Sequence, residues 1–485
     1  MRVDTARKLT IIAEALGAGS LKDSADKVNG GIVAQAAHIA ALAGEPDHAV
    51  SYLVLAVLYD EIPHPDLIKG FTRRWRIDGL AILVEHHVAA RKRRRRRIDS
   101  ARIRVVSSLV ADVTDTARSG FTTGTHQVAR ETLSRWWANH EIVLVTLDGA
   151  SNRFLTASAE EAERVVLQPV TVGPREFIVP FRATLLLPEI VGDDERATRL
   201  RTIARFSGGR SVAIGFDCIP VTTAETAAPG MPGAFSRYLS TLARFDAVVP
   251  ISEAAGQEYR GWRRMLSGAG LSGPQISVLA LPFNAQPEKR PAATATRTEL
   301  GLDGVPIVLS VGSHEPRKNH LNLLHAAELN WRDGRDFALV LVGGNSWQTQ
   351  QFDEFVSSLR RRGRRIVILS GVSDDVVWDL YSLARFSVFC SINEGFGLPI
   401  VESLAYGTPV ITSNFGSMRD LGEGRGALLV DPHDPIAMAE RMRLLLDSDE
   451  EIRALSAQTT DLPSSSWDDY ARQLWELARR KPGMS

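Results

Sequence analysis

The most informative stretch of the chain is SINEGFGLPIVE, residues 391–402, which follows an apolar run and opens a helical pattern. Gly395 and Gly397 allow a tight turn and a close approach of the backbone to a ligand. Pro399 suits the first turn of a helix, because its missing N–H would have no partner there. The free N–H groups of such a turn, together with the helix dipole, predict a site for an anion such as phosphate.

Two carboxylates flank this predicted anion site. Glu394 stands at the turn, and Glu402 lies eight residues further on, within the helix. A carboxylate repels phosphate, but it accepts hydrogen bonds from vicinal sugar hydroxyls, as an acidic residue does with ribose in dinucleotide-binding folds. The pair therefore predicts a nucleotide sugar as ligand, with one carboxylate for each sugar. The alternative is that both are ordinary surface acids favoured by the helix dipole.

Around this stretch, short apolar runs alternate with amphipathic helical patterns. Such a βαβ rhythm predicts parallel sheets covered by helices on both faces. The predicted strands of the second half cover residues 306–312, 337–343, 365–370, 386–391 and 409–413. Those of the first half cover residues 105–113, 142–147, 212–217, 247–251 and 276–281.

Two parts of the chain lack this alternation of strand and helix patterns. They are the first hundred residues and a Pro/Ala/Thr-rich stretch near residue 290. Helical patterns broken by Gly and Pro fill the first hundred residues, and the second stretch is typical of a linker. We therefore predict an α/β protein in five parts. These are a helical region (1–100), an α/β domain (101–284), a linker (285–301), a second α/β domain (302–463) and a C-terminal helix (464–485) that returns to the first α/β domain.

Composition excludes several classes of protein. The 485 residues carry 57 Lys and Arg and 57 Asp and Glu, which excludes a globally basic nucleic-acid coat and a globally acidic tail. The two cysteines, Cys218 and Cys390, cannot form a disulfide framework or a Cys-based zinc site, so a reducing compartment is expected. The charged N-terminus does not suit a signal peptide, and the longest apolar stretch, 50–59, is shorter than the ~20 residues of a membrane span.

The segment EGFGLPIVE resembles the Glu-x7-Glu signature of retaining glycosyltransferases of family 4, which have the GT-B fold. The strand exit SVGSHEPRKN, residues 310–319, and the segment that begins SLAYGTPVITSNFGSMRDL after Glu402 continue this resemblance. It is strong over residues 305–445, looser over residues 103–284, and without a recognised counterpart in the first hundred residues. The resemblance implies two Rossmann-like domains that face a cleft.

The resemblance also implies roles for individual residues. Glu394 would contact hydroxyls of the donor sugar, and Glu402 would contact the nucleotide ribose. Lys318 would neutralise the diphosphate, and Arg317 would replace a second base whose usual place is held by Ser313. The other donor-binding residues implied are Gly395, Phe396, Gly397, Leu398, Gly312 and Val372.

In the first α/β domain the match is looser. Residues 123–128, TGTHQV, resemble the family's Thr-Gly-x-x-Arg-Val turn with glutamine in place of arginine, so Gly124 would open a helix that faces the diphosphate. Residues 215–220, GFDCIP, resemble a His-Asp-x-x-Pro strand end in which Phe216 replaces the histidine. Asp217 is kept and is implied to be catalytic. The missing histidine removes a possible polar contact to the donor or the acceptor.

Charge development suggests how such a site would work. A leaving nucleoside diphosphate becomes more negative, and Lys318, Arg317 and the helix N-terminus would stabilise it. We find no DxD-type acidic pair placed to hold Mg²⁺, so we predict a metal-independent transfer without a cofactor. The resemblance implies retention of the anomeric configuration. Because we identify no nucleophile comparable to that of retaining glycosidases, our hypothesis is front-face attack assisted by the leaving phosphate.

The basic block RKRRRRR, Arg91–Arg97, has three interpretations: a solvated junction, a surface for anionic lipid headgroups, or a contact to nucleic acid. No zinc-finger, helix-turn-helix or aromatic RNA-binding pattern accompanies it, so we expect no nucleic-acid partner. Trp75 nearby suits either a membrane interface or helix packing. We therefore expect a cytoplasmic protein that can attach to an anionic membrane surface.

These features together predict a retaining hexosyltransferase. It would move a sugar from a nucleoside diphosphate sugar to a glycan or lipid-linked acceptor during surface polysaccharide or glycolipid assembly. The EPRKN motif resembles that of mannosyl- and rhamnosyltransferases, and this resemblance implies mannose or a related hexose. The alternative is a non-catalytic GT-B scaffold that uses its first hundred residues to bind a partner enzyme. The departures at Ser313 and Phe216 keep this alternative open.

Overall fold

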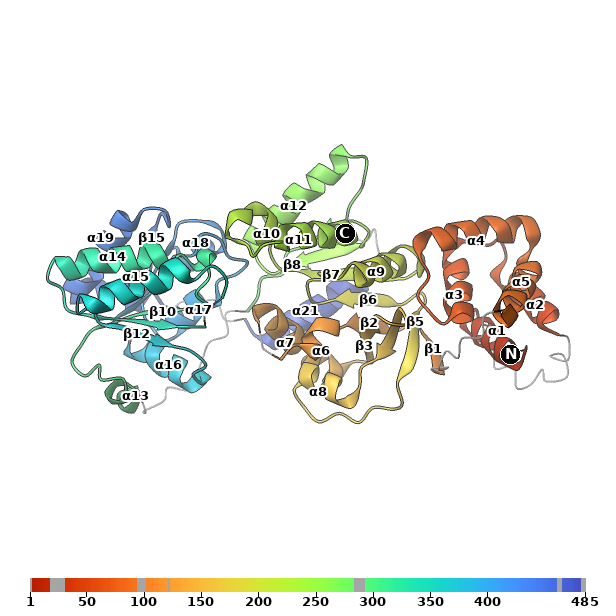
Figure 1. The fold of residues 1–485 in the computed structure, drawn as a ribbon, viewed down its shortest axis with the longest axis horizontal. Coiled ribbons are helices and arrows are strands. Elements are labelled where there is room, and N and C mark those ends of the chain that lie inside the picture. The colour runs from red at the N-terminus through yellow and green to blue at the C-terminus, as the bar shows by residue number, and fades with distance from the viewer. Residues whose placement is uncertain are drawn as a thin grey trace.

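The computed structural model describes residues 2–17, 31–93, 102–120, 123–282, 293–344, 346–459 and 465–480. Within these residues the chain forms a region of five helices, a first sheet of nine strands and a second sheet of six strands. Figure 1 shows these parts one after another along the long axis, with the helical region at the right and the second sheet at the left. The predicted α/β class with a preceding helical region is confirmed.

The helical region is built around one apolar helix. Its helices are α1 (Arg2–Ala15), α2 (Ile32–Ala43), α3 (His48–Tyr59), α4 (Pro65–Asp78) and α5 (Leu80–Arg93). Residues 50–58 of α3 are all buried. Asp47 caps this helix, since its side chain accepts a hydrogen bond from Val50 N at 2.8 Å. Asp60, just after α3, forms an ion pair with Lys8, which is only 2% exposed.

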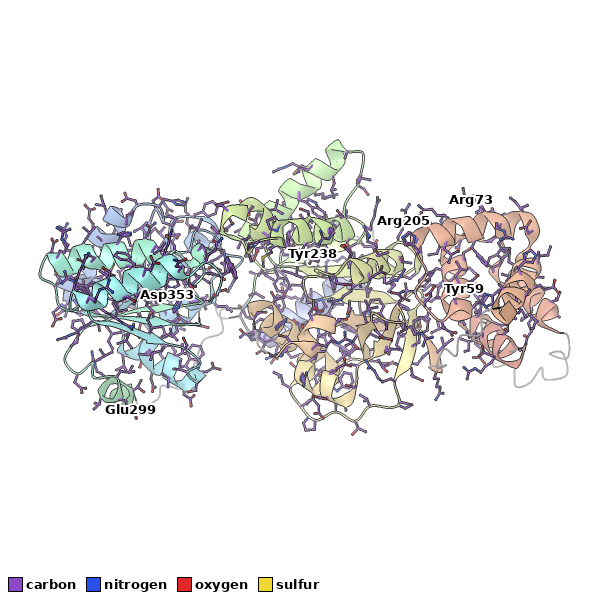
Figure 2. The ribbon with its side chains drawn as sticks, viewed as in Figure 1. Tyr59, Arg73, Arg205, Tyr238, Glu299 and Asp353 are labelled. Carbon is purple, nitrogen blue, oxygen red and sulfur yellow. The ribbon has the colours of Figure 1, made fainter. Side chains whose placement is uncertain are left out.

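The helical region shares a hydrophobic core with the first sheet. The core that contains α3 continues into residues of β5 and α9, such as Phe177 and Leu200. The ring of Phe206 in α9 lies 5.5 Å from the ring of His48 in α3, and Arg205 stacks on that same phenylalanine at 5.2 Å. Figure 2 labels Arg205 at this junction. Within residues 31–93, the helical region therefore packs directly against the first α/β domain.

The first sheet has the strand order β1-β5-β4-β3-β2-β6-β7-β8-β9. All its pairs are parallel except those of β4, which runs antiparallel to β3 and β5. The strands are β1 (Arg102–Val106), β2 (Leu109–Asp112), β3 (Ile142–Asp148), β4 (Arg153–Thr156), β5 (Glu176–Pro180), β6 (Thr184–Leu187), β7 (Arg210–Gly215), β8 (Ala247–Pro250) and β9 (Gln275–Ile276).

Two strand predictions for this sheet were wrong in detail. The single strand predicted over 105–113 is divided into β1 and β2, which are separated by Ser107 and Ser108 and are not neighbours in the sheet. The strand predicted over 276–281 is reduced to the short edge strand β9. Apolar runs mark which residues are buried but not where pairing begins and ends, and this explains both errors.

Helices cover both faces of the first sheet. They are α6 (Thr114–Arg118), α7 (Gly124–Asn139), α8 (Ala159–Val166), α9 (Asp194–Phe206), α10 (Ile219–Thr222), α11 (Met231–Leu242) and α12 (Glu253–Gly268), with a 3-10 turn η2 (Ala224–Thr226). Figure 1 shows α9 and α11 on one side of the sheet and α7, α8 and α21 (Trp467–Arg479) on the other.

A buried arginine ties three of these elements together. Arg196 of α9 is 2% exposed, and its guanidinium lies 2.8 Å from Asp112 at the end of β2 and 2.7 Å from Asp115 of α6. It also pairs with Glu189, which accepts hydrogen bonds from the backbone N–H and the hydroxyl of Thr116. Asp112, at the end of a parallel strand, is therefore a structural residue held inside the domain.

The second sheet is entirely parallel, in the order β12-β11-β10-β13-β14-β15. Its strands are β10 (Ile307–Val311), β11 (Ala338–Val342), β12 (Ile366–Leu369), β13 (Phe386–Phe389), β14 (Val410–Ser413) and β15 (Ala427–Val430). The order reverses beside β10, between β11 on one side and β13 on the other. In open parallel sheets, ligands bind outside the carboxyl ends of the strands at such a reversal.

Helices also cover both faces of the second sheet. They are α14 (His320–Arg332), α15 (Gln350–Arg361), α16 (Asp374–Leu383), α17 (Leu398–Ala405), α18 (Gly416–Gly422), α19 (Pro435–Asp447) and α20 (Asp449–Gln458), with a 3-10 turn η3 (Pro316–Lys318). Figure 1 shows α14, α15 and α19 on one side of the sheet and α16 and α17 on the other.

The segment predicted as a linker is partly helical. Residues 283–292 lie outside the described residues, but α13 (Ala293–Glu299) follows directly. The hydroxyl of Thr296 donates to Asp379 of α16 at 2.7 Å, which fixes this helix to the second α/β domain. Its Ala/Thr composition carries no amphipathic stripe, so the sequence pattern did not reveal it. The domain boundaries themselves stay a prediction.

The last helix, α21, packs on the first α/β domain. The indole N–H of Trp136 in α7 donates to the carbonyl of Ala471 at 2.8 Å, and the ring of Trp475 meets the Trp136 ring edge-on at 5.0 Å. Leu474 is fully buried in this contact. The chain therefore crosses from the second α/β domain back to the first before it ends, as the neighbouring positions of α21 and α7 show in Figure 1.

The structure bears on the membrane expectations only in part. Among the described residues no helix is both long and apolar enough to cross a bilayer. Of the basic block Arg91–Arg97, only the helical backbone of residues 91–93 is described, and the rest of the block lies outside the described residues. Trp75 is 5% exposed and packs edge-on against Phe71 at 6.0 Å, so it is a helix-packing residue.

Candidate active site

Glu394 lies in the loop that follows β13, beside the loop that follows β10. Because these strands are neighbours, both loops meet at the C-terminal edge of the second sheet. Glu394 Oε1 is 2.7 Å from Lys318 Nζ and 2.6 Å from Arg317 Nη1. The exposed fractions of the three side chains are only 10%, 12% and 18%, so this ion cluster is largely withdrawn from solvent.

Burial and the opposite charges compete at this cluster. Burial raises the pKa of Glu394, but Arg317 and Lys318 outweigh burial and lower that pKa to about 2. Burial lowers the pKa of Lys318, and Glu394 only partly opposes this. Burial also disfavours the charged form of Arg317, but Glu394 and Glu315 overcome it and raise the pKa of Arg317. Glu394 is therefore ionised at neutral pH and is held by two cations.

The two cations have different surroundings. Arg317 donates to the backbone carbonyl of Asn393 at 2.9 Å and to the carboxylate of Glu315, so it organises both loops as well as pairing with Glu394. Lys318 Nζ lies over the ring of Phe389, 4.7 Å from its centre. Arg317 already pairs with two carboxylates, whereas Lys318 pairs with Glu394. Lys318 is therefore the cation with more hydrogen-bonding capacity left for an anionic ligand.

Asp217, from the other α/β domain, reaches the same place. It follows β7, and its Oδ2 is 2.6 Å from where a Cβ would stand on Gly395. Any side chain at 395 would therefore collide with it, which explains the glycine better than turn formation does. Burial raises the pKa of Asp217 to about 6, with Arg317 opposing and Glu258 and Glu394 adding to the rise. The four residues predicted to be catalytic thus converge.

Several residues that the sequence interpretation missed join the two domains here. Ser252 Oγ donates to the carbonyl of Gly395 at 2.6 Å. Glu258 of α12 accepts from the Cys218 N–H at 2.8 Å and from the Thr222 hydroxyl at 3.0 Å. Asn393 of the second domain lies 3.5 Å from that same carboxylate. Ser252 precedes a helix and Glu258 lies within one, so both match ordinary capping and surface positions and give no signal in the sequence.

The turn before α17 has the predicted features of an anion site. Gly397 has a φ of 109° and stands at the N-cap position, where a side chain would strain the backbone. Pro399 lies in the first turn, and within the described residues no side chain caps the helix. Phe396 is 6% exposed and packs into a hydrophobic core, so only its backbone can serve a ligand. Leu398 begins the helix and is half-buried.

Glu402 lies further along α17, and its hydrogen-bond partner is a tyrosine. The hydroxyl of Tyr381 in α16 donates to Glu402 Oε2 at 3.0 Å. Burial raises the pKa of Glu402, and this hydrogen bond only partly offsets the effect. The remaining lone pairs of the carboxylate suit the acceptance of hydroxyl hydrogen bonds. The place of Tyr381 beside Glu402 was not predicted, because a tyrosine in an amphipathic helix is usually a core residue.

The other predicted donor-binding residues are distributed as follows. Gly312 follows β10 with a φ of 148°, and a Cβ there would lie 3.4 Å from Lys318 Cε. Ser313, next in the chain, and Val372, in the loop after β12, are both half-buried at the same edge of the sheet. Gly124 is exposed at the start of α7, and a Cβ on it would meet nothing within 4 Å. The structure therefore gives Gly124 no steric reason to be glycine.

The cysteines and possible metal ligands add little to this site. Cys218 and Cys390 are both free and 4% exposed, and burial raises the pKa of each thiol, as suits small core residues. In the described part of the chain no group of three or more His, Cys, Asp or Glu side chains is placed to hold a metal ion. Metal independence of the transfer stays a prediction.

Comparison with known proteins identifies the second half of the chain. The family described as "Glycosyl transferases group 1" matches residues 293–461. A serotype-specific mannosyltransferase WbdA of Escherichia coli is 24% identical over 336 residues, which is 65% of this chain and 40% of that protein. The O-antigen chain mannosyltransferase B of Escherichia coli is 34% identical over 170 residues, 34% of this chain and 43% of that protein. The chain thus spans less than half the length of these relatives.

A solved structure shows the fold. The Anabaena protein HepE, crystallised in complex with UDP, superimposes with a TM-score of 0.54 at 16% identity, over 77% of this chain and 99% of its own. The described α/β domains have the GT-B arrangement that the resemblance implied. Glu394, Lys318 and Glu402 all lie within residues 293–461, the segment that the family matches. Residues 293–461 therefore match the group 1 glycosyl transferase family, and the fold around them is that of GT-B proteins.

Proposed function

We propose that this chain is a retaining family 4 glycosyltransferase that moves a hexose from a nucleoside diphosphate sugar to a glycan or lipid-linked acceptor. The observation that carries the proposal is the convergence of Asp217, from the first α/β domain, on the ion cluster of Glu394, Lys318 and Arg317. Charged side chains are rarely buried together without a ligand or a structural need. Here they lie where parallel strands of the two sheets present their carboxyl ends.

The diphosphate and both sugars of a nucleotide sugar have matching groups at this edge. The uncapped first turn of α17 offers backbone N–H groups to the diphosphate. Lys318, 12% exposed, supplies the cation. Glu402 has acceptor capacity for ribose hydroxyls, and Glu394 for hydroxyls of the transferred sugar. When a diphosphate binds, Lys318 would divide its charge between the phosphate and Glu394, and this would free carboxylate oxygens for the sugar.

The chemistry follows from these positions. The bond between the anomeric carbon and the β-phosphate oxygen breaks, and the charge that develops on the leaving diphosphate is stabilised by Lys318 and the N-terminus of α17. The acceptor hydroxyl attacks the same face of the sugar, and its proton passes to the leaving phosphate oxygen. Asp217 lies against the backbone of Gly395, where it can position the acceptor. This front-face route retains the anomeric configuration without a carboxylate nucleophile.

Mannose and polysaccharide assembly are the more specific part of the proposal. Both Escherichia coli relatives carry the word mannosyltransferase in their names, and one is named for the O-antigen chain. These names support GDP-mannose or a related donor and an acceptor in surface polysaccharide assembly. Cytoplasmic location and attachment to an anionic membrane through Arg91–Arg97 belong to the same proposal.

The first test is a thermal-shift screen of the purified chain against GDP, UDP, dTDP, ADP and CMP and their common sugars, with EDTA present. A ligand that binds only the folded state raises the melting temperature by mass action. We expect one nucleotide and its sugar to give a clear shift. Glu402→Ala should weaken that shift, whereas Glu440→Ala, an exposed acid of α19, should leave it unchanged. A folded protein without any shift would contradict donor binding.

The alternative function is a non-catalytic scaffold, and one observation favours it. Phe216 stands where the family has a histidine, and it is 4% exposed in a hydrophobic core, so it adds no polar group to the cleft. Transfer from the donor found in the screen should be lost in Glu394→Gln if the site is catalytic. Glycan assembly in cells that persists with Glu394→Gln would support the scaffold instead.

A further inference from the structure

One carboxylate of the first α/β domain holds both ends of the short segment that follows Asp217. Glu258 of α12 accepts a hydrogen bond from the backbone N–H of Cys218 at 2.8 Å through Oε2, and one from the hydroxyl of Thr222 at 3.0 Å through Oε1. Cys218 directly follows Asp217, and Thr222 is the last residue of α10. Glu258 therefore fixes the backbone next to Asp217 from the side of α12.

Asp217 bonds to the same segment with one of its two carboxylate oxygens. Its Oδ1 accepts a hydrogen bond from the backbone N–H of Ile219 at 3.2 Å. Its Oδ2 is turned toward Gly395 of the second α/β domain, 2.6 Å from where a Cβ would stand. Because a shift of residues 218–222 would carry Asp217 with it, the hydrogen bonds of Glu258 to this segment also set where Oδ2 lies.

The second α/β domain reaches Glu258 through Asn393. The side-chain nitrogen of Asn393 lies 3.5 Å from Glu258 Oε1 and 3.4 Å from the hydroxyl of Thr222. Asn393 is 6% exposed, its carbonyl accepts from Arg317 at 2.9 Å, and it directly precedes Glu394. Figure 1 shows α10 and α12 on the side of the first α/β domain that lies next to α18. A movement of the second domain would therefore separate Asn393 from Glu258.

The charges at this junction require more than a cap for α10. In the described part of the chain, the groups that donate to Glu258 are a backbone N–H, a hydroxyl and an amide, all of them neutral. The charged groups that face Asp217 are Arg317, which lowers its pKa, and Glu258 and Glu394, which raise it. A like charge beside a buried carboxylate disfavours its ionised form. A role in folding alone does not explain why a carboxylate, rather than a neutral acceptor, stands beside Asp217.

We infer that Glu258 is a positioning residue, which holds Asp217 against Gly395 and does so fully only while Asn393 of the second α/β domain is beside it. Glu258 acts through Asp217 and not by contact with a substrate. The inference deepens the proposed transfer reaction and rests on it for the catalytic consequence. The placement of Asp217 itself can be measured without any substrate.

The first test is an NMR titration of the side-chain carboxyl carbon of Asp217 in the full chain, with Asp217→Asn to assign the signal. The parent should titrate near pH 6. Glu258→Gln keeps the shape of the side chain but removes its charge, so the midpoint should fall by about half a pH unit or more. Glu258→Ala also releases residues 218–222 and admits solvent, so the midpoint should fall further, toward the ordinary 3.8. Glu253→Gln, which removes an exposed charge from the first turn of α12, should leave the midpoint unchanged.

Asn393→Ala tests the part of the second α/β domain. This variant removes no charge, so it should lower the midpoint of Asp217 only if Asn393 helps to keep Glu258 in place. The shifts of Asn393→Ala and Glu258→Ala should be less than additive in the double variant. An unchanged midpoint in Asn393→Ala, or fully additive shifts, would overturn the coupling between the domains. An unchanged midpoint in both Glu258 variants would overturn the positioning role.

The second test measures catalysis with the donor that the thermal-shift screen identifies. Glu258→Gln should lower kcat about tenfold or more and leave the KM for the donor nearly unchanged, because Asp217 is displaced and the donor-binding groups are not. The pH near 6 at which the rate of the parent changes through Asp217 should move down with the NMR midpoint. A residue that served folding alone would alter neither kcat nor this pH.

The two tests separate the inference from the proposed function. If the parent binds no nucleotide and transfers no sugar, the proposed function fails, and the titration of Asp217 still decides whether Glu258 positions it. If the parent is active and Glu258→Gln matches its kcat and its pH profile, the positioning role fails and the proposed function stands.

Discussion

Asp217 is an acidic side chain whose protonation should be visible in the stability of the whole protein. Its pKa in the folded chain is raised to about 6, mainly by burial, whereas an unfolded aspartate titrates near its ordinary value of 3.8. The folded state therefore binds the proton more tightly, so this group makes the protein less stable as pH rises from about 4 to about 6. Above about pH 6, the loss of stability caused by Asp217 is complete and no longer changes with pH.

Asp217→Asn should remove this loss. At neutral pH we expect the variant to be more stable than the parent chain by about 1–3 kcal/mol, and to match it near pH 4. Urea unfolding at a series of pH values measures the difference. Glu440→Gln, which changes an exposed acid, is the control and should show no such slope. A constant difference between parent and Asp217→Asn across this range would contradict the assigned pKa.

Gly395 offers a second test at the residue scale. A Cβ at this position would stand 2.6 Å from Asp217 Oδ2 and 3.2 Å from Asp217 Cβ, so Gly395→Ala must push the two loops apart. We expect a loss of about 1–3 kcal/mol in the free energy of unfolding. In Gly395→Ala/Asp217→Gly the obstruction is gone, and much of the loss should be recovered. A double-mutant cycle in which the two effects simply add would show that the residues do not touch.

At the scale of single elements, the buried ion network of Arg196 is the sharpest feature. Arg196→Met leaves Asp112 and Glu189 in the interior without their cation, and Glu189 already has its pKa raised by burial. Breaking one partner of a buried pair costs about 3–5 kcal/mol, which chemical denaturation can measure. Arg237→Met removes an exposed arginine that pairs with Asp194, and should cost less than about 1 kcal/mol. Equal effects would mean that burial of the network is unimportant.

Sequence patterns predicted elements well where local signals are strong. The start of α17 was predicted correctly because Gly397 and Pro399 act on their own backbone. The family resemblance placed Lys318, Arg317 and Glu394 around one ligand, but their direct ion pairs were not predicted, since 76 residues separate Lys318 from Glu394 in the chain. The pairing of strands was harder to predict from the sequence. The antiparallel β4 and the break between β1 and β2 depend on partners far away in sequence, which an apolar run does not name.

At the scale of the whole molecule, the return of the C-terminal helix to the first α/β domain was predicted, but the individual hydrogen bonds between the domains were not. Ser252 donates a hydrogen bond to the carbonyl of Gly395. Trp347 donates one to the carbonyl of Thr226 at 3.1 Å. Each bond joins segments more than 100 residues apart in the chain. Each residue alone is typical of a cap or a loop. The same holds for the helical region, whose apolar helix α3 predicted burial but not the sheet domain with which it shares a core. Such partners depend on tertiary geometry that local patterns do not encode.

The chain path yields a last prediction, because α21 follows the second α/β domain in sequence but packs on the first. Leu474 is fully buried against α7 and the first sheet, so Leu474→Ala should remove about 2–5 kcal/mol of stability by leaving a cavity there. Hydrogen exchange measured by mass spectrometry should then show faster exchange in α7 and β6, but not in β11 or α15. Leu444→Ala, a partly exposed leucine of α19, should leave both domains unchanged. Faster exchange confined to the second α/β domain would contradict the observed packing, because the lost contacts would then lie with the sheet that precedes α21 in the chain.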